Sequence, residues 1–347
     1  MLPDGRRLGA HLPLSSGMLK TIDRAVAIGA DALQIFTDNP TAWRRRASPP
    51  RELDAFRARL AARDITPLSI HASYLINLPG PDETTYERSI ELLALELRGA
   101  PAYGARFVNV HIGSHRGTGV EAGVDRLVDG IEAALRRADE PADDAPREDE
   151  QLTLVLENSA GGGGGLGTSV DELTAVAGRL ESRGIGRDRV AFCIDTAHAW
   201  GAGIDMGDPD AIDAFLDDFD HRIGLDRVAM VHLNDTRSGL GSRTDRHEHL
   251  GAGRIGSAGL GHVLRHPGLA HAPAIIETPG MDVGYDKVNL DRARALAAGE
   301  DLDALPAEAF DLVGSARGRG AGTGDAARGT TKGAATPGTA RSRTAPS

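Results

Sequence analysis

The segment LTLVLENSAGGGGGLGTSVDELTAVAGRLESRGIGRDRVAFCID (152–195) contains the pattern that decides the fold. It begins and ends with two apolar runs, LTLVLE (152–157) and VAFCID (190–195), which lack the strict alternation of a half-exposed strand. Between them, VDELTAVAGRLESR (170–183) repeats apolar residues at helical spacing. The segment therefore predicts two buried parallel strands joined by a helix that covers them.

The same alternation continues along the chain in both directions. Six further strand-type runs are LGAHL (8–12), ALQIF (32–36), PLSIH (67–71), RFVNVH (106–111), RVAMVHL (227–233) and AIIE (274–277). Helical patterns between the runs cover 18–29, 52–63, 89–100, 124–138 and 210–222. Eight strands with covering helices are the number that closes a (β/α)8 TIM barrel, an α/β fold. An open doubly wound sheet is the alternative, which the lack of a GxGxxG sequence after the first strand disfavours.

The chain of 347 residues is expected to form one barrel domain over 1–315 and a basic tail over 316–347. The tail is rich in Gly, Ala, Arg and Thr with almost no large apolar residue, so we predict that it is disordered. The chain shows neither an apolar run of the roughly 18 residues that a membrane span needs nor a signal-peptide pattern, which favours a cytoplasmic protein. The single cysteine, Cys193, is interpreted as a buried strand thiol.

Side chains of the kinds that bind metals recur where the predicted strands end, which is where a TIM barrel builds its active site. Six of them are strand-end residues, namely His71, His111, Glu157, Asp195, His232 and Glu277. Three more, His198, Asp245 and His247, follow in the loops after two of these strands. A single such residue is usually explained by loop hydrogen bonding, but nine in one barrel mouth are explained best by bound divalent ions.

The number and type of these ligands point to a reaction. Nine ligands at three or four per ion, with one carboxylate bridging, fit three ions better than one. Imidazole and carboxylate favour zinc, and manganese or iron also suits the carboxylate-rich positions. Neighbouring ions ionise a water and stabilise the leaving oxygen of a displacement at phosphorus, so the site predicts phosphoester hydrolysis.

The same residues lie in longer motifs that resemble endonuclease IV, the family of zinc-dependent apurinic/apyrimidinic endonucleases. The motifs are GAHLPLSSG (9–17), HASYLINL (71–78), NVHIGSH (109–115), LENSAG (156–161), CIDTAHAWGAG (193–203), HLNDTRSGLGSRTDRHEHLGAGRIG (232–256) and IIETPG (275–280). From the third predicted strand to the eighth, the motifs occur along the chain in the order of the family. The resemblance extends from about residue 8 to about residue 300 and includes every ligand position.

The resemblance implies how the ligands divide among three zinc ions. The first ion takes His71 and His111, and the second takes Asp195, His232 and Glu277, with Glu157 bridging the two. The third ion takes His198, Asp245 and His247. Asp235 and His249, which lie in the same stretch, are then not ligands.

The resemblance also implies the reaction and the catalytic residues. In the family, a hydroxide between the first two ions attacks the phosphate on the 5′ side of an abasic site in duplex DNA, and the third ion stabilises the departing 3′ oxygen. The products are a 3′-hydroxyl and a 5′-deoxyribose phosphate. Glu157 and Glu277 are the expected catalytic residues, and Glu277 also orients the attacking water. A monomeric DNA-repair enzyme is expected.

Two loops are expected to contact DNA. Tyr74 resembles a family residue that enters the minor groove near the lesion. The loop TDNPTAWRRR (37–46) matches a loop that contacts DNA, which selects Asn39, Trp43 and Arg44, with the next two arginines as further phosphate contacts. Thr41 stands where some members carry an intercalating arginine.

The formal net charge of −11 does not exclude a DNA partner. Residues 316–347 carry a local charge of +5, which leaves −16 on the rest of the chain, and bound metal ions would neutralise part of the remainder. Nucleic-acid binding depends on where the positive charge lies, so a basic tail is compatible with it.

Two other functions compete with the endonuclease. A metal-dependent sugar isomerase or epimerase on a similar barrel also uses strand-end His, Asp and Glu. Such an enzyme needs one or two ions, so the trio His198, Asp245 and His247 argues against it. A non-catalytic relative would have lost ligand positions, and none is lost. His11 and His115 are interpreted as hydrogen-bonding residues of the barrel mouth.

Overall fold

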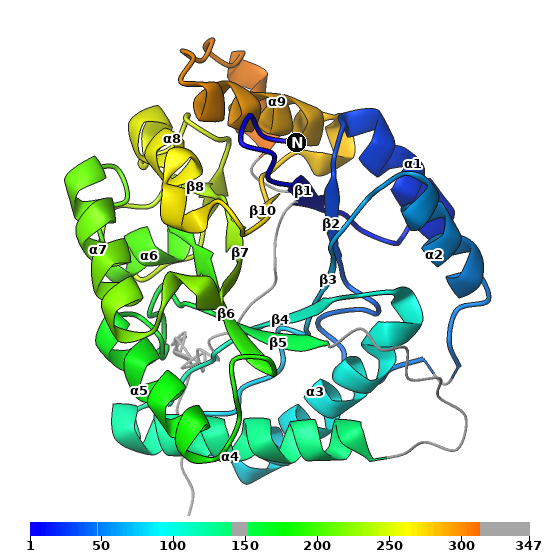
Figure 1. The fold of residues 1–347 in the computed structure, drawn as a ribbon, viewed down its shortest axis with the longest axis vertical. Helices are drawn as coiled ribbons and strands as arrows, with labels where there is room; N and C mark the ends of the chain where they lie inside the picture. The colour runs from blue at the N-terminus through cyan, green and yellow to red at the C-terminus, as the bar shows by residue number, and fades with distance from the viewer. Residues whose placement is uncertain (47, 141–151, 313–347) are drawn as a thin grey trace, which may run out of the picture. The chain divides into compact units, whose positions relative to one another are not determined.

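The computed structural model describes residues 1–46, 48–140 and 152–312, and the predicted tail over 316–347 lies outside them. Eight strands form its centre: β1 (Leu8–His11), β2 (Ala32–Ile35), β3 (Leu68–His71), β4 (Phe107–His111), β5 (Thr153–Glu157), β6 (Val190–Asp195), β7 (Val228–His232) and β10 (Ala274–Ile276). They close into a barrel in the order β1, β10, β7, β6, β5, β4, β3, β2, with every neighbouring pair parallel (Figure 1). The predicted TIM barrel is confirmed.

The strand predictions hold to within one residue at each end. This accuracy has a physical reason, because a barrel strand is covered by helices on one side and by the barrel interior on the other. Strands β2, β3 and β6 are buried along their whole length. Cys193 in β6 is a buried free thiol, as predicted.

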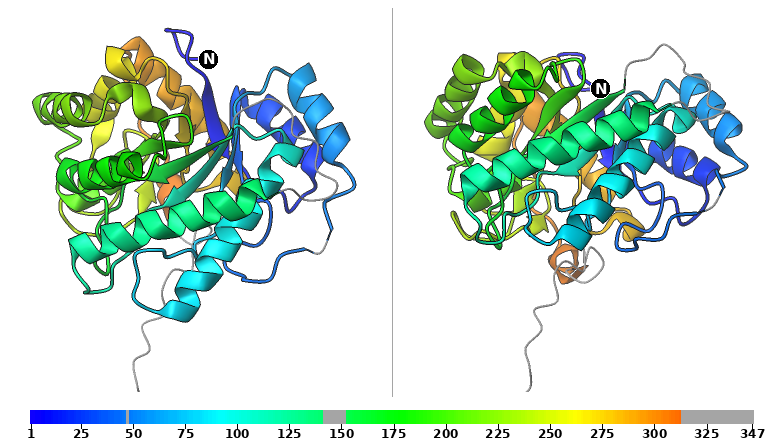
Figure 2. Two further views of the ribbon diagram at one scale, coloured as in Figure 1. Left: turned by 60° about the horizontal axis from the view of Figure 1, so that its bottom comes forward. Right: turned by 90° about the horizontal axis from the view of Figure 1, so that it is seen from below.

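Helices surround the barrel and cover the strands (Figures 1 and 2). They are α1 (Met18–Ile28), α2 (Leu53–Ala62), α3 (Glu83–Tyr103), α4 (Val120–Asp139), α5 (Val170–Ser182), α6 (Thr196–Ala202), α7 (Pro209–Arg222), α8 (Gly256–Arg265) and α9 (Tyr285–Ala298). Short 3-10 turns are η1 (Leu225–Arg227), η2 (Pro267–Leu269), η3 (Met281–Val283) and η4 (Ala307–Leu312). Within the described residues, no helix combines the length and the apolarity that a membrane crossing requires.

The described chain ends at the opposite end of the barrel from where it begins. The N-terminal segment enters β1 at the end where the strands start, and η4 lies at the other end (Figure 2). There η4 packs beside a buried histidine, His249, whose Nε2 donates to the carbonyl oxygen of Ala309 at 3.0 Å. The last described residues therefore lie at the end where the strands terminate.

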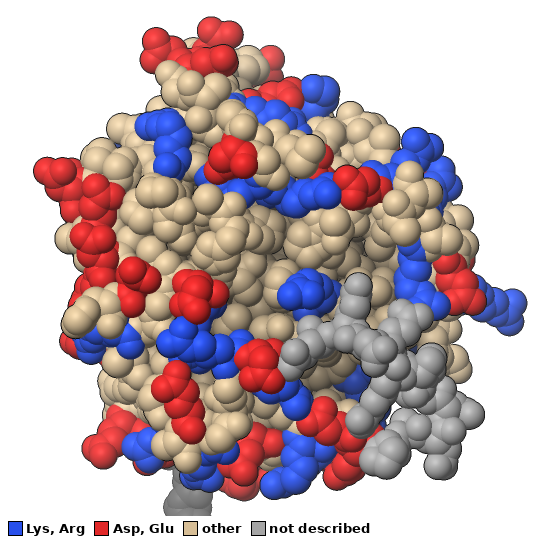
Figure 3. All heavy atoms as spheres, in the orientation of Figure 1, with Lys and Arg blue, Asp and Glu red and all other residues tan. Residues whose placement is uncertain are grey.

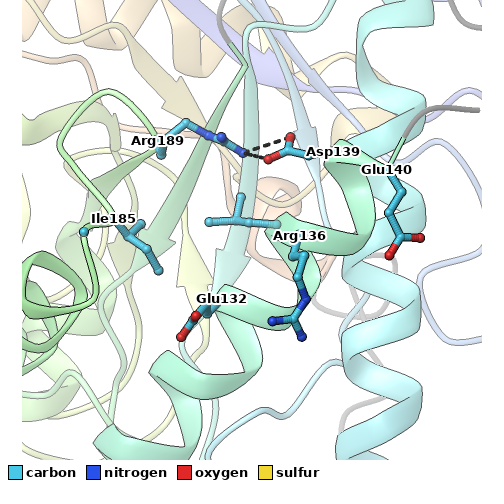
Figure 4. Close-up of a pocket in the computed structure, with 8 residues that line it drawn as sticks. Glu132, Arg136, Asp139, Glu140, Ile185 and Arg189 are labelled. Carbon is cyan, nitrogen blue, oxygen red and sulfur yellow. Dashed lines mark hydrogen bonds and ion pairs between the residues drawn. The ribbon is translucent and has the colours of Figure 1, made fainter.

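Two surface hollows lie away from that end. One, of about 590 Å³, opens at the starts of the strands, and Figure 3 views this face. Four of its five arginines are neutralised by ion pairs, namely Arg6–Asp4, Arg7–Asp64, Arg187–Asp226 and Arg227–Glu181. The other, of about 410 Å³, lies beside the end of α4, where Arg189 pairs with Asp139 (Figure 4). Neither hollow contains a predicted metal ligand.

Candidate metal centre

Strand ends deliver six of the nine predicted ligands to one place. His71, His111, Glu157, Asp195 and His232 are the last residues of β3 to β7, and Glu277 directly follows β10. The strand register sets ligands side by side, because His111 pairs with Glu157 and Asp195 pairs with His232 across neighbouring strands. The parallel ladder therefore places these six side chains together at one end of the barrel.

The ligand-type atoms form three groups among the described residues, each with all its atoms within 4.8 Å of one another. They are His71–His111–Glu157, then Glu157–Asp195–His232–Glu277, and finally Asp195–His198–His247. We name them the first, second and third group. Neighbouring groups share a carboxylate, since Glu157 belongs to the first two and Asp195 to the last two.

Glu157 is the central carboxylate of the site. It is fully buried, and its Oε2 lies 3.7 Å from Nε2 of His71 and 3.6 Å from Nε2 of His111. Its other oxygen, Oε1, lies 3.2 Å from Nδ1 of His232. One oxygen therefore faces the first group and the other faces the second, which is the arrangement of a bridging carboxylate.

Asp245 lies next to the third group. Its Oδ1 is 2.9 Å from Nε2 of His247, and its Oδ2 is 3.3 Å from Nε2 of His198. The three residues expected together are therefore brought together, and Asp195 joins them, with its Oδ2 at 3.9 Å from Nε2 of His247. The loop after β7 reaches this position through a small antiparallel hairpin, β8 (Asp235–Thr236) and β9 (His247–Glu248).

Each of four histidines has one ring nitrogen hydrogen-bonded to an oxygen that is not one of the ligand atoms. Nδ1 of His71 bonds to the backbone carbonyl oxygen of Ala72 at 2.8 Å, and Nδ1 of His198 bonds to that of Asn158 at 2.9 Å. Nδ1 of His247 bonds to the backbone carbonyl oxygen of Glu277 at 2.8 Å. In His232 the held nitrogen is Nε2, which lies 3.2 Å from Oε1 of Gln34. An acceptor at one nitrogen leaves the lone pair of the other nitrogen for a metal ion.

Buried amides, which sequence reasoning missed, surround the carboxylates. Asn109 donates to Oε2 of Glu157 at 2.6 Å, and Asn234 donates to Oδ2 of Asp195 at 2.7 Å. Gln34 donates to Oε1 of Glu277 at 2.8 Å. The two asparagines were detectable in principle, because each lies two residues from a ligand histidine in sequence. Gln34 carries no such signal.

Charge interactions set the protonation of the site. Burial raises the pKa of Glu157, but the neighbouring histidines, His232 and His111 foremost, outweigh burial and hold that pKa well below its usual range. Burial also lowers the pKa of His111, to about 4. A deprotonated carboxylate beside a neutral imidazole is the form in which both bind a metal cation.

In the third group, the pKa of His247 is shifted in the opposite direction. Burial lowers the pKa of His247, but the carboxylates of Asp245, Asp195 and Glu277 outweigh burial and raise it to about 10. Carboxylates gathered this closely therefore need positive charge nearby, which is supplied either by imidazolium or by metal ions.

The donor set fits divalent metal ions on the evidence of its own atoms. A ligand set of imidazole nitrogens and carboxylate oxygens, without sulfur, is one that binds zinc and related metals. Nε2 of His11 is buried without a hydrogen-bond partner among the described residues, and Nε2 of His247 is buried with only the ion-pair contact to Oδ1 of Asp245 at 2.9 Å, although buried polar atoms are normally hydrogen-bonded. The His247 nitrogen faces the third group, so a cation there would satisfy it.

The residues expected to contact DNA lie in loops beside this site. Tyr74 is 41% exposed, and its ring lies 5.4 Å from the ring of His71 and 5.7 Å from that of His111. Asn39 is exposed and organises its own loop, since its Oδ1 accepts from the backbone N–H of Thr41 at 3.0 Å. Trp43 is half-buried and packs on the core. The loop with Asn39 is joined to the loop with Tyr74 by two hydrogen bonds to the carbonyl oxygen of Pro40.

The arginines of that loop have different environments. Arg45 is paired with the buried carboxylate of Glu96, and Arg46 lies 3.1 Å from Asp38. Their expected use as phosphate contacts is therefore weakened, because both are already engaged within the protein. Arg44 is exposed, and the described residues hold no ion-pair partner for it. His115 accepts from two backbone N–H groups of its own loop, as its hydrogen-bonding role predicted.

Fold and site together define a class, a TIM barrel whose active face carries three adjoining histidine–carboxylate groups suited to divalent metals. The family model described as a xylose isomerase-like TIM barrel matches residues 22–307. A probable endonuclease 4 from Methanoculleus marisnigri is 39% identical over 290 residues, covering 84% of this chain and 98% of its own length. The endonuclease IV crystal structure from Thermus thermophilus is 38% identical, with a TM-score of 0.71 and coverage of 84% and 99%. The chain belongs to the endonuclease IV family.

More distant structures share the fold alone. A D-tagatose 3-epimerase-like protein is 15% identical with a TM-score of 0.59, covering 88% of this chain and 98% of its own. Barrels of this type therefore support different reactions, and the function must be argued from the site.

Proposed function

We propose that this protein is a DNA-repair endonuclease that hydrolyses the phosphodiester on the 5′ side of abasic sites in duplex DNA. Relatives of similar length that are named endonuclease 4 support a nuclease activity. The observation that carries the finer proposal is the third group, with Asp245 against both of its histidines, beside two groups that already share Glu157. Three adjoining groups favour phosphodiester hydrolysis, which benefits from charge stabilisation on both the attacking and the leaving oxygen.

The nine ligands would hold three zinc ions in the division that the resemblance implies, which the three groups match except that Asp195 stands in the third group and Asp245 lies beside it. His71 and His111 hold one, Asp195, His232 and Glu277 hold another with Glu157 shared, and His198, Asp245 and His247 hold the last. Manganese also suits the carboxylate-rich positions. When bound, such ions lower the pKa of water and stabilise negative charge on phosphate oxygens.

The side chains of the chain itself perform the remaining steps. Glu277 is 15% exposed at its side chain, so it is the least buried carboxylate of the second group and the one that meets an entering phosphate and water. Its Oε1 is held by two donors, so its Oε2 is the oxygen that faces the second group and, at the edge of that group, an attacking water. Glu157 is fully buried and fixes the spacing between the first two groups. The products would be a 3′-hydroxyl and a 5′-deoxyribose phosphate.

Duplex DNA is the proposed partner of the face around this site. Tyr74 at 41% exposure and the exposed Arg44 supply an aromatic wedge and a phosphate contact. The apolar side chains of Leu240, 46% exposed, and Val283, 60% exposed, lie in the loops after β7 and β10 and add to this surface. Asn39 and Trp43 shape the loop that presents Arg44. Action as a monomer and a cytoplasmic location stay predictions.

A duplex with one tetrahydrofuran abasic analogue tests the proposal. The zinc-loaded full chain should nick it on the 5′ side of the lesion and leave a 3′ end that a polymerase extends, while an undamaged duplex stays intact. Glu277→Gln should slow cleavage by on the order of 10²–10⁴-fold with DNA binding retained, because the orienting carboxylate is removed. Glu300→Gln, an exposed position after α9, is the matched control.

The second candidate, a sugar isomerase or epimerase, is addressed by the same preparation. It rests only on fold likeness to distant structures. A protein that leaves the lesion duplex intact but isomerises a pentose or hexose would overturn the endonuclease proposal.

A further inference from the structure

Gln34 is a fully buried amide in an otherwise apolar strand, β2. In the strand register, Gln34 pairs with His11 in β1 and with Ser69 in β3. Gln34 therefore lies between these two strands, near the end of the barrel where the strands terminate. Burying an amide costs free energy unless both of its ends are hydrogen-bonded. The partners of the two ends therefore indicate what the residue does.

Both ends of the Gln34 amide contact residues of the second group. Its Nε2 lies 2.8 Å from Oε1 of Glu277, and its Oε1 lies 3.2 Å from Nε2 of His232. His11 completes the network, since its Nδ1 lies 3.0 Å from the same Glu277 oxygen. One neutral side chain thus connects a carboxylate and an imidazole that come from β10 and β7.

The chemistry of Glu277 fixes the direction of the two hydrogen bonds that the Gln34 amide forms with Glu277 and His232. A carboxylate only accepts hydrogen bonds, so the amide end that faces Glu277 must be the NH₂ group. The other end is then the carbonyl oxygen, which only accepts, so Nε2 of His232 must carry the proton. In neutral His232 the lone pair is therefore on Nδ1.

That lone pair points at the metal-ligand atoms. Nδ1 of His232 lies 3.2 Å from Oε1 of Glu157, 3.6 Å from Oε2 of Glu277 and 3.9 Å from Oδ2 of Asp195. Gln34 and His11 meanwhile occupy Oε1 of Glu277, which leaves Oε2 facing the second group. The amide therefore selects one nitrogen of His232 and one oxygen of Glu277 for the metal.

We propose that Gln34 is a positioning residue that fixes both the tautomer of His232 and the orientation of the Glu277 carboxylate in the second metal group. The proposal deepens the proposed function and rests on it only in assuming that the group binds a metal ion. Gln34 does not touch the reacting phosphate. It acts through two ligands at once, so its removal should weaken one group and spare the others.

Gln34→Met tests this role, because methionine nearly preserves the volume and removes both hydrogen bonds. Zinc competition with a chromophoric chelator should show one ion of the protein held on the order of 10–100-fold more weakly, the usual cost of losing a residue that orients a ligand. Asn289→Leu is the matched control, since Asn289 is also fully buried and bonds to a histidine, His249, outside the three groups. The control should lose stability but keep the zinc affinities of the wild type.

A second measurement needs no variant. Long-range nitrogen–proton correlation spectra of the zinc-loaded protein should place the proton of His232 on Nε2, whereas His71, His198 and His247 carry theirs on Nδ1. A proton on Nδ1 of His232, or unchanged zinc affinities in a folded Gln34→Met protein, would overturn the proposal. Both readouts are made without DNA, so a failure of abasic-site cleavage is recorded separately from a failure of this inference.

Discussion

Glu96 in α3 links the two loops that are expected to contact DNA. Its Oε1 is paired with Arg45 of the first loop and accepts from the backbone N–H of Ser73, beside Tyr74 of the second, at 3.3 Å. Its Oε2 is buried without a hydrogen-bond partner among the described residues. Burial therefore raises the pKa of Glu96 to about 7, in spite of the attraction of Arg45.

This pKa predicts a pH dependence of folding stability. Because the carboxyl has a pKa of about 7 when folded and near 4.5 when unfolded, the native protein binds more protons than the unfolded chain between these values. Stability should therefore fall as the pH rises from 4.5 to 7, by up to roughly 3 kcal/mol from this group. In Glu96→Gln, this fall of the free energy of unfolding with rising pH should be absent. Urea unfolding at several pH values measures it.

The control for that experiment is Glu83→Gln, at an exposed position of the same helix. Its stability should follow the wild-type curve with pH. Parallel curves for the wild type and Glu96→Gln would show that the carboxyl of Glu96 has an ordinary pKa in the folded protein.

Single-residue predictions could be made where one residue carries its own signal. A histidine or a carboxylate that closes an apolar run identifies itself, and the three groups contain six such residues. Gln34 could not be found in this way, because a polar residue in an apolar strand gives no indication of the partners that other strands bring to it. The partner of Arg45 could not be found from the sequence for the same reason, since Glu96 lies 51 positions away.

At the scale of elements, the excursion after β7 shows how a loop is made rigid enough to present ligands. Asp235 is fully buried at its base and accepts from the backbone N–H groups of Thr236, Gly253, Ile255 and Gly256. It lies opposite Glu248 in the hairpin that carries His247. A Cβ at Gly253 would lie 2.4 Å from Oδ1 of Asp235, so only glycine allows this approach.

Asp235→Ala should therefore affect one metal group more than the others. Loss of the carboxylate leaves several buried N–H groups unsatisfied and should lower the free energy of unfolding by roughly 2–4 kcal/mol. The third group should lose its ion first, because His247 lies in β9 and Asp245 lies two residues before it, in the connection between β8 and β9. Metal content after gel filtration and urea unfolding measure the two effects.

Asp208→Ala provides the comparison for Asp235→Ala. Asp208 caps α7 by accepting from the backbone N–H of Asp210 and belongs to none of the three groups, and its loss should cost about 1 kcal/mol. It should retain every ion. Equal metal loss in the two variants would mean that the third group responds to global stability and not to the Asp235 anchor.

Elements were predictable in proportion to their apolar periodicity. The eight barrel strands were found because helices and the barrel interior bury them on both sides. Helices α6, α8 and α9 were not predicted. Seven residues in α6 are too few to show a period, and α8 carries three glycines that lower its helix propensity. For α3, the pattern 89–100 missed the first six residues, which begin after the cap of Asp82.

At the scale of the whole molecule, the two ends of the barrel differ in chemistry. The end where strands terminate gathers the ligands, while the arginines at the other end are mostly paired with carboxylates. The described chain ends on the ligand side, where Leu312 approaches Gly280 in the loop after β10. In sequence, residues 316–347 with their six basic side chains follow this end of the described chain.

The basic character of 316–347 predicts a salt-dependent contribution of these residues to DNA binding. Deleting these residues should weaken binding at low salt and make the dependence of affinity on salt less steep, by about 0.9 for each phosphate that the tail neutralises. Fluorescence anisotropy with a lesion duplex at several salt concentrations measures both. A variant with the six basic residues of the tail changed to Gln should behave like the deletion. Identical affinity of the full and shortened chains at low salt would contradict the prediction.

Strand β6 passes into helix α6 with no residue between them, and Asp195 belongs to both. Its Oδ1 accepts from the backbone N–H of His198 as the helix cap, while its Oδ2 faces the second and third groups. The two roles of Asp195 allow different substitutions. Asparagine can cap the helix but lacks the negative charge, whereas glutamate keeps the charge but has a side chain too long for the cap. No natural side chain other than aspartate meets both demands. An exchange at this position would therefore cost either the cap of α6 or the carboxylate that the second and third groups share.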